Sequence, residues 1–479
     1  MTAPEQTSEQ ASDSNSHTLK TPEGPNGGFL GLSLGAKLAK DPLQTIKGLR
    51  EEFGSIFQFK VLNQHVYSIH SPELIREAVV KNADSLAMSK RQAEVFGDIY
   101  GDNVMTTSDA VWKRQRRILN PGFVPKKIAG YLSLIDDAIN DSISRLTTGG
   151  AQEKTLVDID RFATKLTMDV ILRVLFGFKA SDDESNSIAD AVRGLEHQSI
   201  RELMWPATPP EWFPYPGRNA KAKNKAILDT VIDSQIKQRR DEQDSTVRKP
   251  DYLDMLMKAR DEEASSSDDS ATLTDKEIHD NCSVIFAAGH DTTAGALVWW
   301  IGLMTEYPEY AAKIRQQIEE VIGDRQPTPE DVSQLTWLNA SIRETMRKCP
   351  SVVALFNRTT TKDIQVGEYV IPKDKTVSVL FWDVHNNPEW YKEPEKFLPE
   401  RFMPGADKIP KGAYIPFGIG PRVCIGQHLA MLELSMIGIA LLRNFDFQFK
   451  EGERLPAPKV EMLLKPETPL HLYFSKRAI

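Results

Sequence analysis

The sequence predicts a mainly α-helical fold with a minor β portion. From about residue 72 onward, apolar residues recur at helical spacing, and the longest such run lies between residues 274 and 307. Strand-like runs are short and few, and they are interspersed with the helical ones without an internal repeat. This order predicts a mostly helical chain with a minor sheet component.

Length and composition restrict the class of protein. The chain has 479 residues, of which 40% are hydrophobic and 26% charged, a balance typical of globular proteins with a sizeable core. Its net charge of -8 argues against a nucleic-acid-binding protein, which would usually be basic. The only 3 cysteines are Cys282, Cys349 and Cys424, too few for a disulfide framework, so we expect a reducing compartment.

The N-terminal segment, residues 1–28, is predicted to be a disordered tail. It is rich in Ser, Thr, Glu, Gln, Pro and Gly, and it carries neither an apolar run nor the regions of a secretory signal. We therefore expect no integral membrane anchor and a cytoplasmic protein, with residues 29–479 forming the folded domain.

Local patterns predict the individual elements in chain order. Residues 54–61 and 66–69 have the pattern of a β-hairpin, and residues 205–216, rich in proline and aromatic side chains, predict a loop. An acidic, serine-rich stretch at 261–275 predicts an exposed linker. The other predicted elements are helices at 132–146, 162–176, 336–348 and 425–442, and strands at 364–371, with a turn at Gly367, and at 376–381.

A long buried helix is the clearest of these elements. Thr274 and Glu277 have the spacing of a capping box and predict its start, and Pro308 marks its end. The stretch 282–304 is apolar nearly all round, which is typical of a buried helix. A transmembrane span is the alternative, but a histidine and an aspartate in the middle of the helix argue against it, because a charge is costly in lipid.

A glycine-rich loop, residues 417–426 with the sequence FGIGPRVCIG, is the sharpest functional signal. Two glycines and a proline predict a tight loop, and a helix follows directly, so Cys424 lies at a helix N-terminus, where a thiolate is stabilised. Nearby backbone N–H groups can donate to the sulfur and keep it from protonating. Gly426 leaves room for a flat macrocycle close to the backbone. The alternatives are a buried structural cysteine and a zinc ligand, but no second cysteine or histidine lies at ligand spacing.

This loop resembles the heme-binding signature of the cytochrome P450 family, and every fixed position of that signature is matched. The resemblance implies a cytochrome P450 fold with heme b (iron protoporphyrin IX) between the long central helix and the helix after the cysteine loop. It implies that Cys424 is the iron ligand and that Phe417 and Gly426 bind the cofactor. The resemblance extends over roughly residues 29–479; the later motifs look like those of the microsomal-type subgroup, but its N-terminal membrane helix is lacking.

A charged motif before the cysteine loop adds to the resemblance. Glu344 and Arg347 form an i, i+3 pair, which alone is a common helical ion pair. In the family such a pair joins the arginine of a Pro-Glu-Arg-Phe stretch, here Arg401. The resemblance implies a buried structural triad that braces the cysteine loop, since a buried charge needs such pairing.

The long helix contains the sequence AGHDTT at residues 288–293. A threonine there can bond back to a carbonyl one turn earlier, and the small residues leave space above a heme face. A packing notch between helices with a satisfied polar pair is the alternative reading. By resemblance to the family's oxygen-activation motif, Asp291 and Thr292 are the catalytic residues and relay protons, whereas His290 occupies a variable position and receives no role.

Basic residues are the expected ligands of the heme propionates. Trp112 and Arg116 match the family's Trp-x-x-x-Arg helix motif and lie on one side of that helix. Arg422, two residues before the cysteine, is expected to do the same. Arg358, in Asn-Arg-Thr, aligns with a further propionate-binding position of the family.

The resemblance implies a cytochrome P450 monooxygenase, an oxidoreductase that uses dioxygen to hydroxylate a hydrophobic small molecule. The apolar long helix and the stretch 352–355 predict a lipophilic pocket, and we expect a substrate that is fatty-acid-like, terpenoid or similar. Two other functions remain open: a peroxygenase or hydroperoxide-rearranging enzyme of the same fold, and a heme carrier or sensor. Neither needs a proton relay, so Asp291 and Thr292 favour the monooxygenase.

A separate electron donor is implied, because the chain carries no flavin or nicotinamide fingerprint. Residues 105–130 contain six basic residues against one acidic residue, a local net charge of +5. This segment predicts a docking site for an acidic ferredoxin- or flavodoxin-type donor or a reductase. An ordinary solvated helix face is the alternative. The basic residues are Lys113, Arg114, Arg116, Arg117, Lys126 and Lys127, and the acidic one is Asp109.

Overall fold

The computed structural model describes residues 19–26, 28–147, 154–205, 207–209, 212–241, 249–261 and 272–477. Within these residues the fold is mainly helical with small sheets, as the sequence predicts. The helices are α1 (Leu32–Lys40), α2 (Pro42–Phe53), α3 (Pro72–Arg76), α4 (Lys90–Tyr100), α5 (Asp109–Leu119), α6 (Pro125–Ile128), α7 (Leu132–Thr147), α8 (Ile159–Phe176), α9 (Asp182–Leu203), α10 (Arg218–Asp241), α11 (Tyr252–Lys258), α12 (Asp275–Glu306), α13 (Pro308–Val321), α14 (Pro329–Gln334), α15 (Thr336–Lys348), α16 (Phe381–His385) and α17 (Gln427–Asn444). The strands are β1 (Ile56–Val61), β2 (Gln64–Ile69), β3 (Leu86–Met88), β4 (Thr155–Asp158), β5 (Arg358–Thr360), β6 (Ile364–Val366), β7 (Tyr369–Ile371), β8 (Thr376–Ser378), β9 (Phe445–Phe449), β10 (Pro458–Val460), β11 (Leu464–Pro466) and β12 (His471–Lys476).

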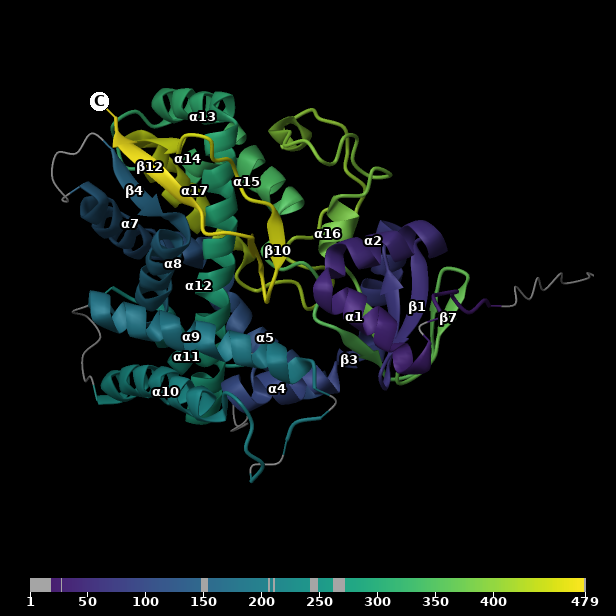
Figure 1. Cartoon of the computed structure of the whole chain (residues 1–479). Helices are drawn as coiled ribbons and strands as arrows, with labels where there is room; N and C mark the ends of the chain where they lie inside the picture. Colours follow the sequence, from purple (N-terminus) through teal and green to yellow (C-terminus); the bar gives the residue numbers. More distant parts are fainter. Residues whose placement is uncertain are drawn as a thin grey trace, which may run out of the picture.

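Helix α12 runs through the centre of the helical body, with α7 and α8 on one side and α15 on the other (Figure 1), and α17 packs against α7, α12 and α15. Its start is the predicted capping box: the Thr274 hydroxyl accepts from the Glu277 N–H at 3.2 Å, and the Glu277 carboxylate accepts from the Thr274 N–H at 2.9 Å. It ends at Glu306, and Pro308 begins α13. Among the described helices, none combines the length and the apolar character that a membrane crossing requires.

The largest sheet lies beside the helical body, under α1 and α2, with strand order β1-β2-β8-β5-β3 (Figure 1). The predicted hairpin is confirmed, since β1 and β2 pair antiparallel with Ile56 opposite Ile69. The predicted hairpin around Gly367 is also confirmed as β6 and β7. The strand expected at 376–381 is shorter, because its pairing with β5 ends early and Phe381 already begins α16.

Folded structure begins upstream of residue 29. The Lys20 N–H donates to the Glu368 carbonyl at 2.8 Å, and the Gln58 N–H donates to the Glu23 carbonyl at 2.9 Å. Part of the segment expected to be a tail therefore pairs with the sheet, because strand edges offer free backbone groups. The rest of that segment, residues 1–18 and 27, lies outside the described residues, as do residues 262–271 of the expected linker and 206, 210 and 211 of the expected loop.

Candidate active site

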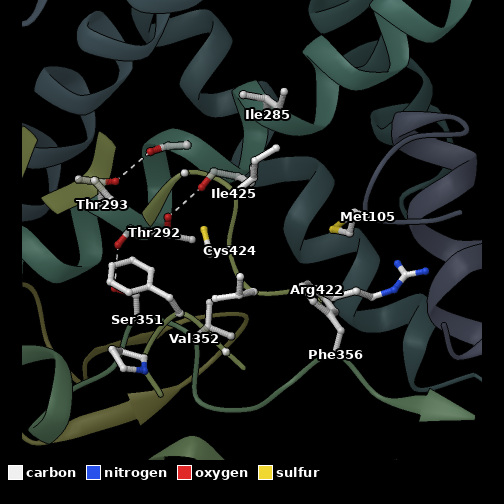
Figure 2. A pocket seen from close by; sticks show the side chains of 18 of the residues that line it. Met105, Ile285, Thr292, Thr293, Ser351, Val352, Phe356, Arg422, Cys424 and Ile425 are labelled. Atoms are coloured by element: carbon white, nitrogen blue, oxygen red, sulfur yellow. Dashed lines mark hydrogen bonds between the residues drawn. The ribbon is translucent and has the colours of Figure 1, made fainter. Parts of the chain in front are cut away.

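A cavity lies between the middle of α12 and the cysteine loop with the start of α17. Figure 2 shows side chains from both sides around it, Thr292 and Thr293 from α12 and Cys424 from the loop. Most of the lining is apolar, including Val104, Met105, Ile285, Val352 and Phe356. The two segments whose motifs were singled out from the sequence, far apart in the chain, therefore form opposite walls of one cavity.

The cysteine loop is held in shape by its own backbone. The Cys424 N–H donates to the Phe417 carbonyl at 2.9 Å, and the Val423 N–H donates to the Gly420 carbonyl at 3.1 Å. Gly418 and Gly420 have φ angles of 79° and 82°, a region that favours glycine. A Cβ on Gly420 would also lie 2.6 Å from the Val79 carbonyl oxygen. The predicted tight loop is confirmed.

Cys424 faces the cavity from within the protein. Protein atoms surround the side chain of Cys424, but the side chain is exposed because the cavity opens in front of the sulfur. The N–H groups of Gly426 and Gln427 donate to the sulfur. Helix α17 begins at Gln427, two residues later than predicted. Gly426 itself lines the cavity, and a Cβ there would meet no atom within 4 Å.

The protonation of Cys424 differs from the expectation. Burial raises the pKa of the thiol, and this outweighs the two N–H groups and the charge of Arg116, which lower it. The loop and Arg116 act on the pKa in the predicted direction, but burial acts more strongly. A metal ion bound to the sulfur would favour the thiolate, since a thiolate ligand loses its proton on binding.

Arginines line the cavity without carboxylate partners. Arg116 donates to the Val423 carbonyl at 2.8 Å, Arg422 to the Thr107 carbonyl at 2.8 Å, and Arg358 contacts the Met88 sulfur at 3.0 Å. Within the described part of the chain, no acidic side chain forms an ion pair with any of them. Burial, followed by Arg422, lowers the pKa of Arg358 to about 9. One buried and two half-buried cations without counter-ions fit a cofactor that carries carboxylates, such as the propionates of heme.

Trp112 does not line the cavity with Arg116. It is 8% exposed, and its ring lies under the Arg422 guanidinium at 4.3 Å from carbon to ring centroid. Its contact is therefore with an arginine of the cavity wall. The propionate-binding roles expected for Trp112, Arg116, Arg358 and Arg422 stay predictions.

The middle of α12 separates the two expected catalytic residues. Thr292 lines the cavity, and its hydroxyl donates to the Ala288 carbonyl at 2.8 Å, the expected back-bond. Asp291 is 2% exposed and does not line the cavity; its carboxylate lies 3.5 Å from Lys465 Nζ of β11. The helix continues unbroken through this bond, and the Ser351 hydroxyl donates to the Thr292 carbonyl at 2.7 Å.

The expected charged triad is present and buried. Arg347 Nε lies 2.7 Å and Arg401 Nε 3.3 Å from the Glu344 carboxylate, and Glu344 and Arg347 are fully buried. Arg347 also donates to the His385 carbonyl at 2.8 Å, and His385 Nε2 accepts from the Ile415 N–H at 2.9 Å. This chain of contacts leads to the start of the cysteine loop, so the triad supports that loop through His385.

The basic segment is less cationic at the surface than its sequence indicates. Lys113 pairs with Asp84 at 3.0 Å, Arg114 with Glu277 at 2.6 Å and Arg117 with Asp261 at 2.8 Å. Arg116 faces the cavity. The predicted patch of six cations is therefore wrong in extent. Lys126 and Lys127 of α6 remain exposed and have no ion-pair partner within the described residues.

Sequence reasoning missed the residues that surround Asp291, namely Lys465 and Glu196. Glu196 lies on α9, and its carboxyl is hydrogen-bonded to that of Asp291. No local signal could have found them, because a single charged residue on a surface helix or a short strand has no distinguishing pattern. Only the packing of α9 and β11 brings them to α12.

What this cavity can hold follows from its walls. A lone cysteine sulfur on one wall can bind a metal from one side only, and the unpaired arginines require an anionic ligand. An iron porphyrin satisfies both, so fold and site define the class of heme-thiolate proteins.

Comparison with known proteins then gives the family. The family model described as Cytochrome P450 matches residues 22–474, and the chain therefore belongs to the cytochrome P450 family. It is a monooxygenase, an oxidoreductase, and its cofactor is heme b.

Similar proteins come from plants and animals. The chain is 28% identical over 432 residues to Protein LUTEIN DEFICIENT 5, chloroplastic, of Arabidopsis thaliana, covering 86% of this chain and 69% of that protein. It is 28% identical to Cytochrome P450 4V2 of Mus musculus, covering 79% of this chain and 74% of the relative. It is 30% identical to 11-oxo-beta-amyrin 30-oxidase of Glycyrrhiza uralensis, covering 79% of this chain and 73% of that protein.

Proposed function

We propose that this monooxygenase hydroxylates a lipophilic small molecule, fatty-acid-like, terpenoid or similar, that binds in the cavity against α12. One observation carries the proposal: beyond Thr292, Thr293 and Ser351, the wall formed by α12 and the segment after α15 is apolar. The cationic groups of the cavity are the arginines assigned to the propionates. A substrate is therefore held mainly by burial of apolar surface.

The name of one relative agrees with a substrate of this class. The Glycyrrhiza uralensis protein is named as an oxidase of 11-oxo-beta-amyrin. Its identity to this chain is 30%, so the shared feature is the kind of substrate and not the molecule.

Within the site, each residue has a proposed task. Cys424 binds the heme iron, whose thiolate ligation favours cleavage of the O–O bond when dioxygen reacts. Phe417 and Gly426 line the cofactor side of the cavity. Arg116, Arg358 and Arg422 hold the propionates, and Trp112 takes part through its ring contact with Arg422. Asp291 and Thr292 deliver protons, Thr292 from its hydroxyl in the cavity and Asp291 from behind it.

Electrons come from a separate protein of ferredoxin or flavodoxin type or from a reductase. The exposed Lys126 and Lys127 of α6, close in sequence to Arg116, support a docking site for an acidic donor on this side. The proposed location is the cytoplasm, which the free state of Cys282, Cys349 and Cys424 supports.

Optical spectroscopy tests the proposal. We expect the reduced holoprotein under carbon monoxide to show the Soret band of thiolate ligation, and a Cys424→Ala variant to lose it. A panel of fatty acids, terpenoids, alkanes and hydrophilic compounds of similar size is then titrated for the spin-state change that follows displacement of water near the iron. If only hydrophilic compounds gave this change, the proposed substrate class would be wrong.

A further inference from the structure

A polar cluster lies behind the cavity wall, where α9 and β11 meet α12. It contains Asp291 from α12, Glu196 from α9 and Lys465 from β11, with Arg193 one turn before Glu196. Strand β11 is fixed against α12 because the Trp299 indole N–H donates to the Leu464 carbonyl at 2.8 Å. This contact holds the ammonium group of Lys465 beside the Asp291 carboxylate.

The carboxyl groups of Asp291 and Glu196 can form a hydrogen bond with each other only if one of them carries a proton. Asp291 Oδ2 is buried, and within the described residues no group donates a hydrogen bond to it. The Glu196 carboxyl is in hydrogen-bond contact with Asp291, and two carboxylates have no donor between them. A proton on one of them supplies the donor and removes the repulsion of two like charges in a buried site.

The environments of the two carboxyl groups decide which one carries the proton. Burial and the charge of Asp291 raise the pKa of Glu196 well above its ordinary value. Burial acts in the same direction on Asp291, but its basic neighbours and the hydrogen bond with Glu196 hold its pKa below the ordinary value. Of the two groups, Glu196 is therefore the one that keeps the shared proton.

The other titratable groups near the pair do not compete for this proton. Burial lowers the pKa of His290, so its ring binds a proton less readily than an ordinary imidazole. Burial raises the pKa of Tyr100, so it stays protonated. Lys465, whose side chain is 25% exposed, balances the single negative charge, whereas the guanidinium of Arg193 is paired with Asp160 at 3.1 Å.

We propose that Glu196 is the proton donor of Asp291 and connects it with solvent. The argument rests on the proposed role of Asp291 and Thr292. In the transfer, the O–H bond of Glu196 breaks and an O–H bond on Asp291 forms; the Glu196 carboxylate then takes a proton from water, and no electron moves. Glu196 is half-buried and Asp291 is buried, so the proton moves inward. Glu196 does not touch the cavity and acts through Asp291.

An infrared measurement on the resting holoenzyme tests the proton assignment without turnover. We expect a protonated-carboxyl C=O band at neutral pH that shifts in deuterium oxide. Glu196→Gln should abolish it and Glu196→Asp should move it. Asp190→Asn, an exposed carboxylate on the same helix, should leave it unchanged. Glu433 is also buried and burial raises its pKa, so a band of its own is expected in every variant. A spectrum of Glu196→Gln that is identical to that of the unchanged protein overturns the proposal.

Turnover then tests the transfer itself. In Glu196→Gln we expect product per electron pair consumed to fall by about three- to tenfold, within the range of a lost proton donor. The decline of coupled turnover at alkaline pH, as Glu196 loses its proton, should disappear in this variant, and Glu196→Asp should restore part of both. The optical spectrum of each variant shows that heme and fold are retained.

The outcomes separate this proposal from the one beneath it. If Asp291→Asn uncouples turnover but Glu196→Gln does not, Glu196 is not the donor and the role of Asp291 stands. If neither variant changes coupling or its pH profile, the proton-delivery role of Asp291 fails, and the Glu196 proposal fails with it.

Discussion

At the scale of single residues, the site is marked by charges that lack partners. Arg116, Arg358 and Arg422 line the cavity without an ion-paired acid within the described residues, whereas the buried Arg347 is fully paired with Glu344. A buried cation without a counter-ion opposes folding of the empty protein. The presence or absence of an ion-paired acid therefore distinguishes structural arginines from arginines that bind a ligand.

Replacing Arg358 by Leu should have opposite effects on the apoprotein and the holoprotein. We expect the free energy of unfolding of the apoprotein to rise by about 1–4 kcal/mol, because a buried unpaired charge is removed. Heme should be released about tenfold faster, because a charge-assisted hydrogen bond to a propionate is lost. Denaturant unfolding and heme transfer to an acceptor protein in excess measure the two effects. Arg358→Lys is the control that keeps the charge; equal destabilisation of both forms in Arg358→Leu would contradict this reading.

Two neighbouring threonines offer a matched test of proton delivery. The hydroxyls of Thr292 and Thr293 both line the cavity and both donate to the carbonyl one turn earlier, at 2.8 and 3.0 Å. Thr292→Val should lower product per electron pair consumed by about tenfold, because the proton route ends at this hydroxyl. Thr293→Val should have little effect. Product and consumed reductant are measured together, and equal losses in the two variants would argue for a packing effect.

At the scale of elements, the cysteine loop depends on backbone shape. Its turn requires positive φ angles at Gly418 and Gly420, but only Gly420 also packs against another backbone segment, at Val79. The nearest atoms to a Cβ on Gly418 are side-chain carbons at 3.8 Å. The two positions therefore separate conformational strain from steric clash.

Gly420→Ala should be more damaging than Gly418→Ala. For Gly418→Ala we expect a loss of about 1–2 kcal/mol in the free energy of unfolding, the cost of a left-handed conformation for an L residue. Gly420→Ala adds a clash with the Val79 carbonyl and should also lower the fraction of protein that retains heme. Unfolding curves and the ratio of heme to protein absorbance check this order. The reverse order would show that the close approach of Gly420 to the Val79 carbonyl does not limit substitution in this loop.

At the scale of the whole molecule, ion pairs between distant segments reduce the positive charge on the surface proposed to bind the electron donor. Arg114 and Arg117 are paired with acids from the start of α12 and from Asp261, so they no longer form an open basic patch. Reversing Arg117 would also place a like charge beside the buried carboxylate of Asp261, so an effect on stability could be mistaken for an effect on docking.

The lysines of α6 give a cleaner test of docking. Lys126→Glu with Lys127→Glu should slow reduction by an acidic electron donor several-fold at low salt, with a smaller difference at high salt, because screening weakens the attraction. Substrate binding should not change. Lys37→Glu with Lys40→Glu on α1 is the control of equal charge change. Stopped-flow reduction at several ionic strengths measures the effect, and equal slowing by the two double variants would leave no specific site on α6.

The sequence by itself determined the features that depend on neighbouring residues along the chain. The capping box at Thr274, the hairpin turn at Gly367, the tight turn of the cysteine loop and the back-bond of Thr292 are all local, so short-range patterns predicted them. The family resemblance, carried by the segment around Cys424, supplied the class of cofactor.

Only the tertiary structure decided which charges meet. It placed Asp291 behind the cavity wall with Glu196 and Lys465, paired Arg114 and Arg117 with distant acids, and raised rather than lowered the pKa of Cys424 through burial. The physical reason is that desolvation and Coulomb interaction depend on distances in space. Residues that are far apart in the sequence set these distances, and no local pattern records them.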